Sequence, residues 1–320
     1  MIMNMVQAIN LALRQEMEKD KTVIVLGEDV GVNGGVFRVT EGLYDKFPGR
    51  VLDTPLAESG IVGTSIGMAV NGMKPVAEIQ FEGFLYPAFD QLVTHAARIR
   101  TRTRGRFHVP LTLRVPYTGG IRALEHHSES PEALLVHMPG IKVVTPSNPY
   151  DAKGLLISAI RDPDPVMYFE PKRVYRAIKM EVPEDEYTIP IGKANVVQEG
   201  SDVTVISWGA MMKQCNDAVK QAKHSCELID VRSLSPLDAK TIAKSVEKTG
   251  RAVIVHEAWR SCGLGAEIAA LIMEKAFLNL EAPVMRVTGP DVPVPLAKLE
   301  NYFIPSTEKI IDAINRTAAF

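Results

Sequence analysis

Short runs of consecutive apolar residues alternate along the chain with segments in which apolar residues recur every three or four positions. The run at residues 22–26 (TVIVL) is typical of a strand that is buried on both faces, as in a parallel sheet. Ahead of it, Ile9, Leu13 and Met17 would share one face of a helix. Further strands are predicted at residues 51–52, 75–79, 111–115, 143–144 and 165–170, and further helices at 85–98, 131–137 and 150–161. This alternation predicts a mostly parallel α/β sheet.

The pattern changes between residues 171 and 190, which are charged, contain proline and show weak periodicity. We interpret this stretch as a crossover between two domains. A second alternating pattern follows it. Its strands are predicted at residues 202–207, 227–231, 252–256 and 284–287, and its helices at 210–223, 238–248, 265–276 and 307–318. The sequence therefore predicts an α/β protein of two doubly wound domains, residues 1–185 and residues 186–320.

Composition narrows the class of protein without identifying it. Of the 320 residues, 46% are hydrophobic and 23% are charged, which is typical of a globular protein with a large core. The net charge of −2 argues against a general binder of nucleic acid or membrane surfaces. The three cysteines form no CxxC pattern, and no apolar run reaches the ~18 residues of a membrane span. We therefore expect a cytoplasmic protein without a signal or transit peptide.

The segment at residues 53–72 (DTPLAESGIVGTSIGMAVNG) places one carboxylate, Glu58, at the start of a predicted helix of small and apolar residues. Pro55 disfavours a helical conformation at Thr54, and Ser59 can cap the helix that follows. Several glycines weaken this helix by propensity, which makes sense if another backbone or a ligand comes very close. From the residues alone, Glu58 fits either a functional carboxylate or an ordinary carboxylate in a solvated capping turn.

Two short patterns suggest other enzymes but lack the required context. Residues 63–67 (GTSIG) match the GxSxG of hydrolases, yet Ser65 lies several residues inside a predicted helix rather than directly after a strand. Residues 263–265 (GLG) resemble the start of a dinucleotide fingerprint, but Ile268 stands where its third Gly or Ala belongs. We therefore favour neither a hydrolase nor a dinucleotide-binding enzyme.

Polar and aromatic residues follow the ends of several predicted strands. Ligands in open parallel sheets bind beyond the carboxyl ends of the strands, so Glu28, Glu58 and residues 82–86 are candidates for one shared edge. The loop that carries His126 and His127 is a candidate for the same edge. The neighbouring aromatic rings fit a core cluster, or one of them could stack on a flat heterocycle: Phe81, Phe84, Tyr86 and Phe89.

The histidines and arginines leave two other kinds of site open. His126, His127 and His137 suggest a metal site, but adjacent histidines rarely face one ion and no HxxxH pattern supports it. Arginines occupy alternate positions from 98 to 106 and could contact nucleic acid. The overall charge favours a solvated face or an acidic partner surface instead.

Longer segments resemble one known family, in order and along nearly the whole chain. They are LGEDVG (26–31), DTPLAESGIVG (53–63), EIQFEGFLYPAFDQ (78–91), EHHSES (125–130), PYDAKGLLISAIRDPDPV (149–166) and TGPDVPVP (288–295). Each resembles the β subunit of the thiamine-diphosphate-dependent 2-oxo acid dehydrogenase, the decarboxylating first component of the pyruvate and branched-chain complexes. The resemblance runs from about residue 3 to residue 320 without large gaps.

The resemblance implies an N-terminal pyrimidine-binding domain for thiamine diphosphate and a C-terminal transketolase-like domain. Within the first domain, Glu58 would hydrogen-bond N1′ of the aminopyrimidine and Phe84 would stack on that ring. Leu56 would form a pocket wall, and Glu28 and Asp90 would be supporting acids.

The resemblance implies two further sets of residues. His127 would serve the reactants and the incoming lipoyl group, so that Glu58 and His127 are the predicted catalytic pair. A structural monovalent cation, K⁺, would be held mainly through backbone oxygens. The positions are Leu111, Ala159, Ile160, Asp162 and Asp164. The mitochondrial pyruvate form commonly has Asn where this chain has Asp164.

The resemblance also implies partners. The chain contains no Gly-Asp-Gly, with which thiamine enzymes bind Mg²⁺ and the diphosphate, so an α subunit in an α₂β₂ heterotetramer would hold both. The expected reaction is oxidative decarboxylation of a small 2-oxo acid, pyruvate or a branched-chain one. The acyl group would pass to lipoyl-lysine on a dihydrolipoyl acyltransferase core. Two alternatives remain: a split transketolase-like synthase subunit and a non-catalytic α/β binding protein.

Overall fold

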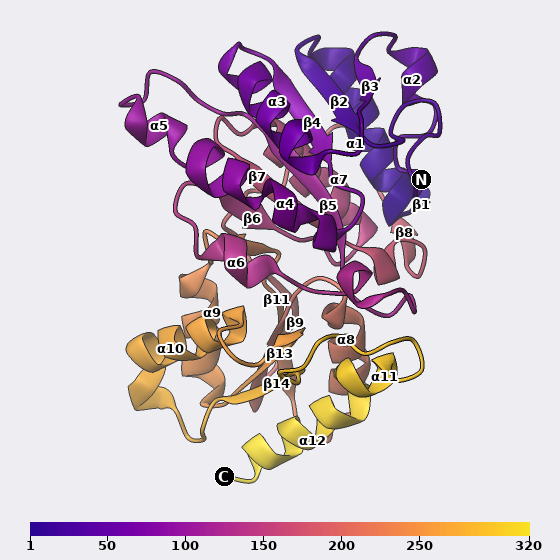
Figure 1. Ribbon diagram of the computed structural model, residues 1–320. Helices are drawn as coiled ribbons and strands as arrows, with labels where there is room; N and C mark the ends of the chain where they lie inside the picture. The colour runs from indigo at the N-terminus through magenta and orange to yellow at the C-terminus, as the bar shows by residue number, and fades with distance from the viewer. The chain divides into compact units, whose positions relative to one another are not determined.

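The computed structural model describes residues 1–320, which form two compact units. The first unit comprises residues 1–117 and 134–191, and the second comprises residues 118–133 and 192–320 (Figure 1). The chain therefore leaves the first unit after Tyr117 and contributes residues 118–133 to the second unit. It returns to the first unit at residue 134 and enters the second unit again after residue 191. No helix is long and apolar enough to cross a membrane.

The first unit is built on a parallel sheet whose strands lie in the order β6-β7-β5-β4-β2-β3. Residues of β2, β5 and β7 are buried throughout, as the continuous apolar runs predict. The bounds are β2 (Val23–Gly27), β3 (Val51–Asp53), β4 (Lys74–Glu78), β5 (Thr112–Tyr117), β6 (Lys142–Val144) and β7 (Val166–Pro171).

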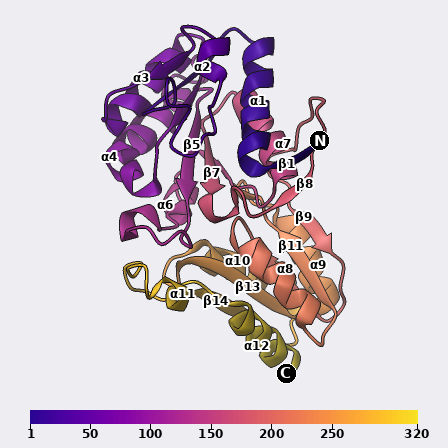
Figure 2. The ribbon, with the colours of Figure 1, turned by 90° about the vertical axis from the view of Figure 1, so that its right-hand side faces the viewer.

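Helices cover both faces of this sheet. Helices α1 (Met5–Lys19) and α7 (Pro149–Arg161) pack together on one face, while α3 (Glu58–Val70) and α4 (Leu85–Asp90) pack on the other (Figure 2). Asparagines cap both helices of the first pair: Asn4 accepts from Gln7 N in a capping box, and Asn148 accepts from Asp151 N. Shorter helices of this unit are α2 (Leu43–Lys46), α5 (Ile99–Arg102) and α6 (Glu132–Val136), of which α6 spans the unit boundary.

The structure differs from the predicted elements in several places. Over residues 85–98, where a single helix is expected, it has α4 and then a π-helical turn (Gln91–Ala96), in which an extra residue per turn interrupts the regular period, and α5 begins only at Ile99. An antiparallel pair, β1 (Ile2–Asn4) with β8 (Lys179–Glu181), was not predicted. Both strands have three residues, which is too short to show an alternating pattern.

A buried ion cluster crosses the centre of the first sheet. Arg114 of β5 is fully buried, and its guanidinium lies 2.5 Å from Glu78 Oε2 and 2.6 Å from Glu170 Oε1. The Tyr175 hydroxyl also donates to Glu170. Burial raises the pKa of Glu78, an effect that the charge of Arg114 partly offsets. The cluster ties three neighbouring strands together through side chains as well as through the backbone.

The second unit is built on a five-stranded sheet in the order β14-β13-β10-β11-β9. Its central strands are parallel, and β9 pairs antiparallel with β11 at the edge. Helices α9 and α10 lie on one side, and α8 and α12 lie on the other (Figure 1). The strands are β9 (Asn195–Gln198), β10 (Val203–Ser207), β11 (Cys226–Asp230), β13 (Ala252–Trp259) and β14 (Met285–Gly289). The short β12 (Ser233–Ser235) also lies in this unit but is not a strand of this sheet. The helices are α8 (Met211–Gln221), α9 (Ala239–Thr249), α10 (Leu264–Ala276), α11 (Glu300–Phe303) and α12 (Thr307–Ala318).

Candidate functional site

The end of β2 begins the candidate site in the first unit. Gly27 pairs with Asp53 of β3 and Glu78 of β4, and the N–H of Thr54 donates to the Gly27 carbonyl at 3.0 Å. Asp53 then fixes the loop after β2, because its carboxylate accepts the backbone N–H of Gly31 at 2.6 Å. A Cβ at Gly31 would lie 2.6 Å from Asp53 Oδ2, so a larger residue there would displace the carboxylate from this position. Sequence reasoning missed this role of Asp53, because Asp53 lies 22 positions after Gly31 in the sequence.

Glu58 is the first residue of α3, at the carboxyl edge of the sheet where the sequence predicts it. Its side chain is half-buried and makes no hydrogen bond or ion pair within the chain. The positive end of the helix dipole favours a carboxylate at this position. Leu56, the predicted pocket wall, precedes it and is 76% exposed. A carboxylate without a partner is therefore available to a ligand at this edge.

Glu28 lies close enough to Glu58 for their charges to interact. Burial raises the pKa of Glu28 above its usual range, and the charges of Glu58 and Asp29 raise it further. Glu28 therefore retains its proton more readily than an exposed glutamate does. A carboxyl with a raised pKa beside an unpaired carboxylate is suited to holding and returning a proton. The structure thus brings two of the sequence-predicted acids together.

A pocket of about 200 Å³ opens beside the start of α3. Its walls come from the end of β2, the loop before α3 and the first turns of α3. The lining residues are Leu26, Thr54, Pro55, Ala57, Gly60, Ile61 and Thr64. None of the predicted site residues lines it, but Ala57 precedes Glu58 in the sequence and small residues around the opening leave room for a ligand or another backbone.

Phe84 ends a 3-10 turn (Glu82–Phe84) that follows β4. Its ring meets Phe81 edge to face, with the ring centroids 6.1 Å apart. A buried ion pair holds the same turn in place: the Lys172 Nζ lies 2.5 Å from Glu82 Oε2. Asp90, at the exposed end of α4, accepts from the Thr94 hydroxyl at 2.7 Å. Phe84 is thus part of an aromatic cluster at the same edge of the sheet as Glu58.

The two short patterns of other enzymes have structural explanations. Ser65 is buried within α3, and its hydroxyl donates to the Ile61 carbonyl at 2.8 Å, as expected of a helical serine rather than a nucleophile on an elbow. Cβ atoms at Gly263 and Gly265 would lie 2.8 Å and 2.5 Å from the His256 ring. Close packing against His256 therefore accounts for both glycines.

His126 and His127 belong to the second unit, in a 3-10 turn (Glu125–His127) of the segment 118–133. Their rings are 4.2 Å apart and nearly perpendicular, in an edge-to-face contact. The His126 Nδ1 lies 3.6 Å from Glu125 Oε1. No group of three or more His, Cys, Asp or Glu side chains in the chain is arranged to hold a metal ion.

The predicted cation positions gather where α7 ends and β7 begins. Ala159 and Ile160 lie in the last turn of α7, Asp162 and Asp164 follow it, and the Leu111 carbonyl accepts from Val166 N at 2.9 Å. The carboxylates already have cationic partners in the chain. The Lys142 ammonium lies 2.7 Å from Asp162, and Arg100 lies 2.5 Å from Asp164. These side chains therefore fit an ion-pair cluster, and only backbone oxygens remain for K⁺.

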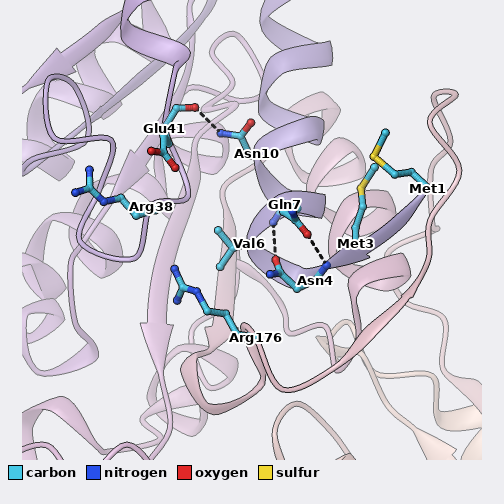
Figure 3. Close-up of a pocket in the computed structure, with 9 residues that line it drawn as sticks. All are labelled: Met1, Met3, Asn4, Val6, Gln7, Asn10, Arg38, Glu41 and Arg176. Carbon is cyan, nitrogen blue, oxygen red and sulfur yellow. Dashed lines mark hydrogen bonds between the residues drawn. The ribbon is translucent and has the colours of Figure 1, made fainter.

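A larger pocket, of about 440 Å³, lies elsewhere in the first unit (Figure 3). It is lined by residues around the start of α1, the loop at 38–41 and Arg176. Figure 3 shows the capping box between Asn4 and Gln7 on one wall, with Arg38 and Arg176 on the opposite side. None of the sequence-predicted site residues lines this pocket, so it is separate from the carboxylates at the sheet edge.

Comparisons with known proteins identify relatives over almost the full length. Residues 2–178 match the transketolase pyrimidine binding domain, and residues 192–310 match the transketolase C-terminal domain. The chain is 56% identical over 321 residues to the pyruvate dehydrogenase E1 component subunit beta of Acholeplasma laidlawii, covering 99% of this chain and 98% of that one. It is 51% identical over 322 residues to the protein of the same name from Staphylococcus epidermidis, covering 99% of each. A solved split-gene transketolase, described as an inactive β4 tetramer, superposes with a TM-score of 0.82 at 21% identity, over 99% of this chain and 98% of that one.

Proposed function

The chain belongs to the family of pyruvate dehydrogenase E1 β subunits, and from this membership we propose that it supplies half of a thiamine-diphosphate site for the oxidative decarboxylation of pyruvate. The observation that carries the proposal is the Glu58 carboxylate. It stands without a partner at the start of α3, beside the buried Glu28, in the domain whose family binds a pyrimidine. These residues fit an aminopyrimidine, which needs one acidic group at its N1′.

Each residue at this edge has one proposed task. Thiamine diphosphate, when bound, supplies a nucleophilic carbon that attacks the 2-oxo acid. Glu58 holds a proton at N1′ and thereby sets the protonation state of the ring, which is general acid–base catalysis by a positioned carboxyl. Phe84 stacks on the pyrimidine and Leu56 excludes water from it. Glu28, whose pKa is raised by burial and by the charge of Glu58, keeps a proton available beside Glu58.

The other half of the site is proposed to come from an α subunit in an α₂β₂ heterotetramer, which would hold Mg²⁺ and the diphosphate. The chain contains no Gly-Asp-Gly, which supports this division. The exposed small residues of α3 support it as well. A Cβ at Gly67 would meet nothing within 4 Å, so packing inside this chain does not require glycine there. Close approach of a second subunit would require it.

We also propose that a structural K⁺ binds near the end of α7. The negative end of the α7 dipole and the backbone oxygens of Leu111, Ala159 and Ile160 favour a cation. Asp162 and Asp164 support it only indirectly, because Lys142 and Arg100 pair with their carboxylates.

The acyl acceptor is proposed to be lipoyl-lysine on a dihydrolipoyl acyltransferase core, with His127 serving the incoming lipoyl group. Pyruvate is the proposed substrate because the relatives from Acholeplasma laidlawii and Staphylococcus epidermidis are pyruvate dehydrogenase components. A branched-chain 2-oxo acid is the second candidate, since its dehydrogenase shares the motifs of residues 26–31 and 53–63.

Reconstitution with an α subunit tests the proposal. The chain alone should bind thiamine diphosphate weakly in the presence of Mg²⁺. With α and a lipoyl domain, tight binding and acylation of the lipoyl domain should appear, and pyruvate should react faster than branched-chain 2-oxo acids. Tight Mg²⁺-dependent binding by the chain alone would contradict the half-site. Turnover that never acylates the lipoyl domain would instead favour a transketolase-like synthase.

A further inference from the structure

Within the second unit, the segment that carries His127 is hydrogen-bonded to a buried carboxylate that lies far away in the sequence. Glu300 opens α11 and is 2% exposed. Its Oε1 accepts the backbone N–H of Gly120 at 2.6 Å, and its Oε2 accepts the N–H of Arg122 at 3.0 Å. Both oxygens of one carboxylate therefore hold the same turn of the loop.

The backbone of this turn is shaped around the Glu300 carboxylate. Thr118, Gly120 and Arg122 have φ values of 80°, 91° and 58°, so two residues with side chains adopt a conformation that usually favours glycine. The N–H groups of Gly120 and Arg122 converge on the one carboxylate. The charge-assisted hydrogen bond from Arg122 to Glu300 helps to hold that residue in its strained conformation. The turn therefore depends on the carboxylate.

The rest of the loop connects this turn to His127 and is itself held at two points. The N–H of Thr118 donates to the Glu129 carbonyl at 3.0 Å and closes the base of the loop. Beyond His127, the hydroxyl of the buried Ser130 donates to Glu257 Oε1 at 3.2 Å. His127 thus lies between two points that are both attached to the second unit.

We propose that Glu300 is a positioning residue for His127: its carboxylate fixes the turn at residues 118–122 and thereby the place at which His127 meets the lipoyl group. Glu300 acts through the loop and does not touch the reactants. The inference rests on the role of His127 in the proposed function. It adds a residue from the second domain, far along the sequence, to the transfer step.

The test compares variants in the reconstituted α₂β₂ enzyme with a lipoyl domain as acceptor. Glu300→Gln retains one acceptor oxygen but turns an amide N–H₂ toward a backbone N–H, so one of the two bonds is lost. We expect lipoyl acylation to fall about tenfold, while decarboxylation with an artificial electron acceptor changes less than about twofold. Glu308→Gln, the same change on the exposed first turn of α12, is the matched control and should leave both rates unchanged.

A double-variant cycle separates positioning from general damage to the fold. If Glu300 acts through His127, then Glu300→Gln should add little to the loss in His127→Gln, whereas independent effects would multiply. Wild-type acylation in Glu300→Gln, or multiplying losses, would overturn the inference while the role of His127 stands. Unchanged acylation in His127→Gln would instead overturn the role of His127, and the inference with it.

A second variant keeps the test decisive if Glu300→Gln fails to fold. Glu300→Asp keeps the charge and both oxygens but shortens the side chain by one methylene, so the oxygens withdraw from the N–H groups of Gly120 and Arg122. It should reproduce the selective loss of lipoyl acylation. A folded Glu300→Asp enzyme with wild-type acylation would count against the proposal.

Discussion

The indole N–H of Trp208 donates to Glu132 Oε1 at 3.1 Å inside the second unit. Burial raises the pKa of Glu132 to about 8, the hydrogen bond from Trp208 lowers it in part, and the charge of Glu257 raises it. The folded chain therefore keeps a proton on Glu132 at pH values at which the unfolded chain has lost it. This contribution to stability is complete below the usual glutamate pKa of 4.5 and is lost as the pH rises toward about 8.

Glu132→Gln should remove this dependence, because the amide oxygen still accepts the Trp208 N–H and carries no charge. We expect the variant to gain stability over the wild type as the pH rises from about 5 to about 8, by on the order of a few kcal/mol. Urea denaturation followed by tryptophan fluorescence measures it, since both tryptophans, Trp208 and Trp259, lie in the second unit. A stability difference that does not change with pH would contradict the burial of an uncharged Glu132.

Arg114→Met should destabilise the first unit by about 3–5 kcal/mol, because it leaves Glu78 and Glu170 buried without their cation. The matched control is Arg100→Met, which breaks an ion pair whose arginine side chain is 50% exposed and should cost about 0–1 kcal/mol. Denaturation followed by far-UV circular dichroism compares the two. Equal losses would show that the buried cluster contributes no more than a surface pair.

His127→Ala should slow acyl transfer to a lipoyl domain more than it slows decarboxylation with an artificial electron acceptor. The reason is that His127 is proposed to act on the incoming lipoyl group rather than on the pyrimidine. The neighbouring His126→Ala shows whether the loss is specific to His127, since the two rings lie 4.2 Å apart in edge-to-face contact. An equal loss in both assays, or no loss in either, would argue against this role.

The fold could be predicted largely because its central strands are long apolar runs. The α/β class and the two transketolase-type domains are confirmed, and the helix predicted at 307–318 coincides with α12. Short elements such as β1 and β8 carry too few residues to produce a pattern. The π-helical turn at Gln91–Ala96 was missed because its cause is local geometry rather than polarity.

The site could be predicted in part. Glu58 is found at the start of α3 and interacts with Glu28, whereas the roles of Glu58, Glu28, Phe84 and His127 all stay predictions. Glu300 could not be foreseen, because its contact with Gly120 joins residues 180 positions apart. Arg114 had a visible signal, since an arginine inside the apolar run of β5 must be buried and paired.

The role of Glu58 is the central claim, and one substitution tests it directly. Glu58→Gln keeps the size and shape of the side chain but cannot hold and return a proton at the pyrimidine. Assembly with α should persist, because the substitution keeps the shape of the side chain and breaks no hydrogen bond or ion pair within this chain. Glu308→Gln, at the first turn of α12, is again the matched control.

The decisive measurement is the rate of pyruvate decarboxylation by the reconstituted Glu58→Gln enzyme, at saturating thiamine diphosphate and Mg²⁺. We predict a loss of at least about 100-fold with unchanged α₂β₂ assembly, in line with the removal of a general acid–base group. Wild-type turnover in a correctly assembled Glu58→Gln enzyme would contradict the account.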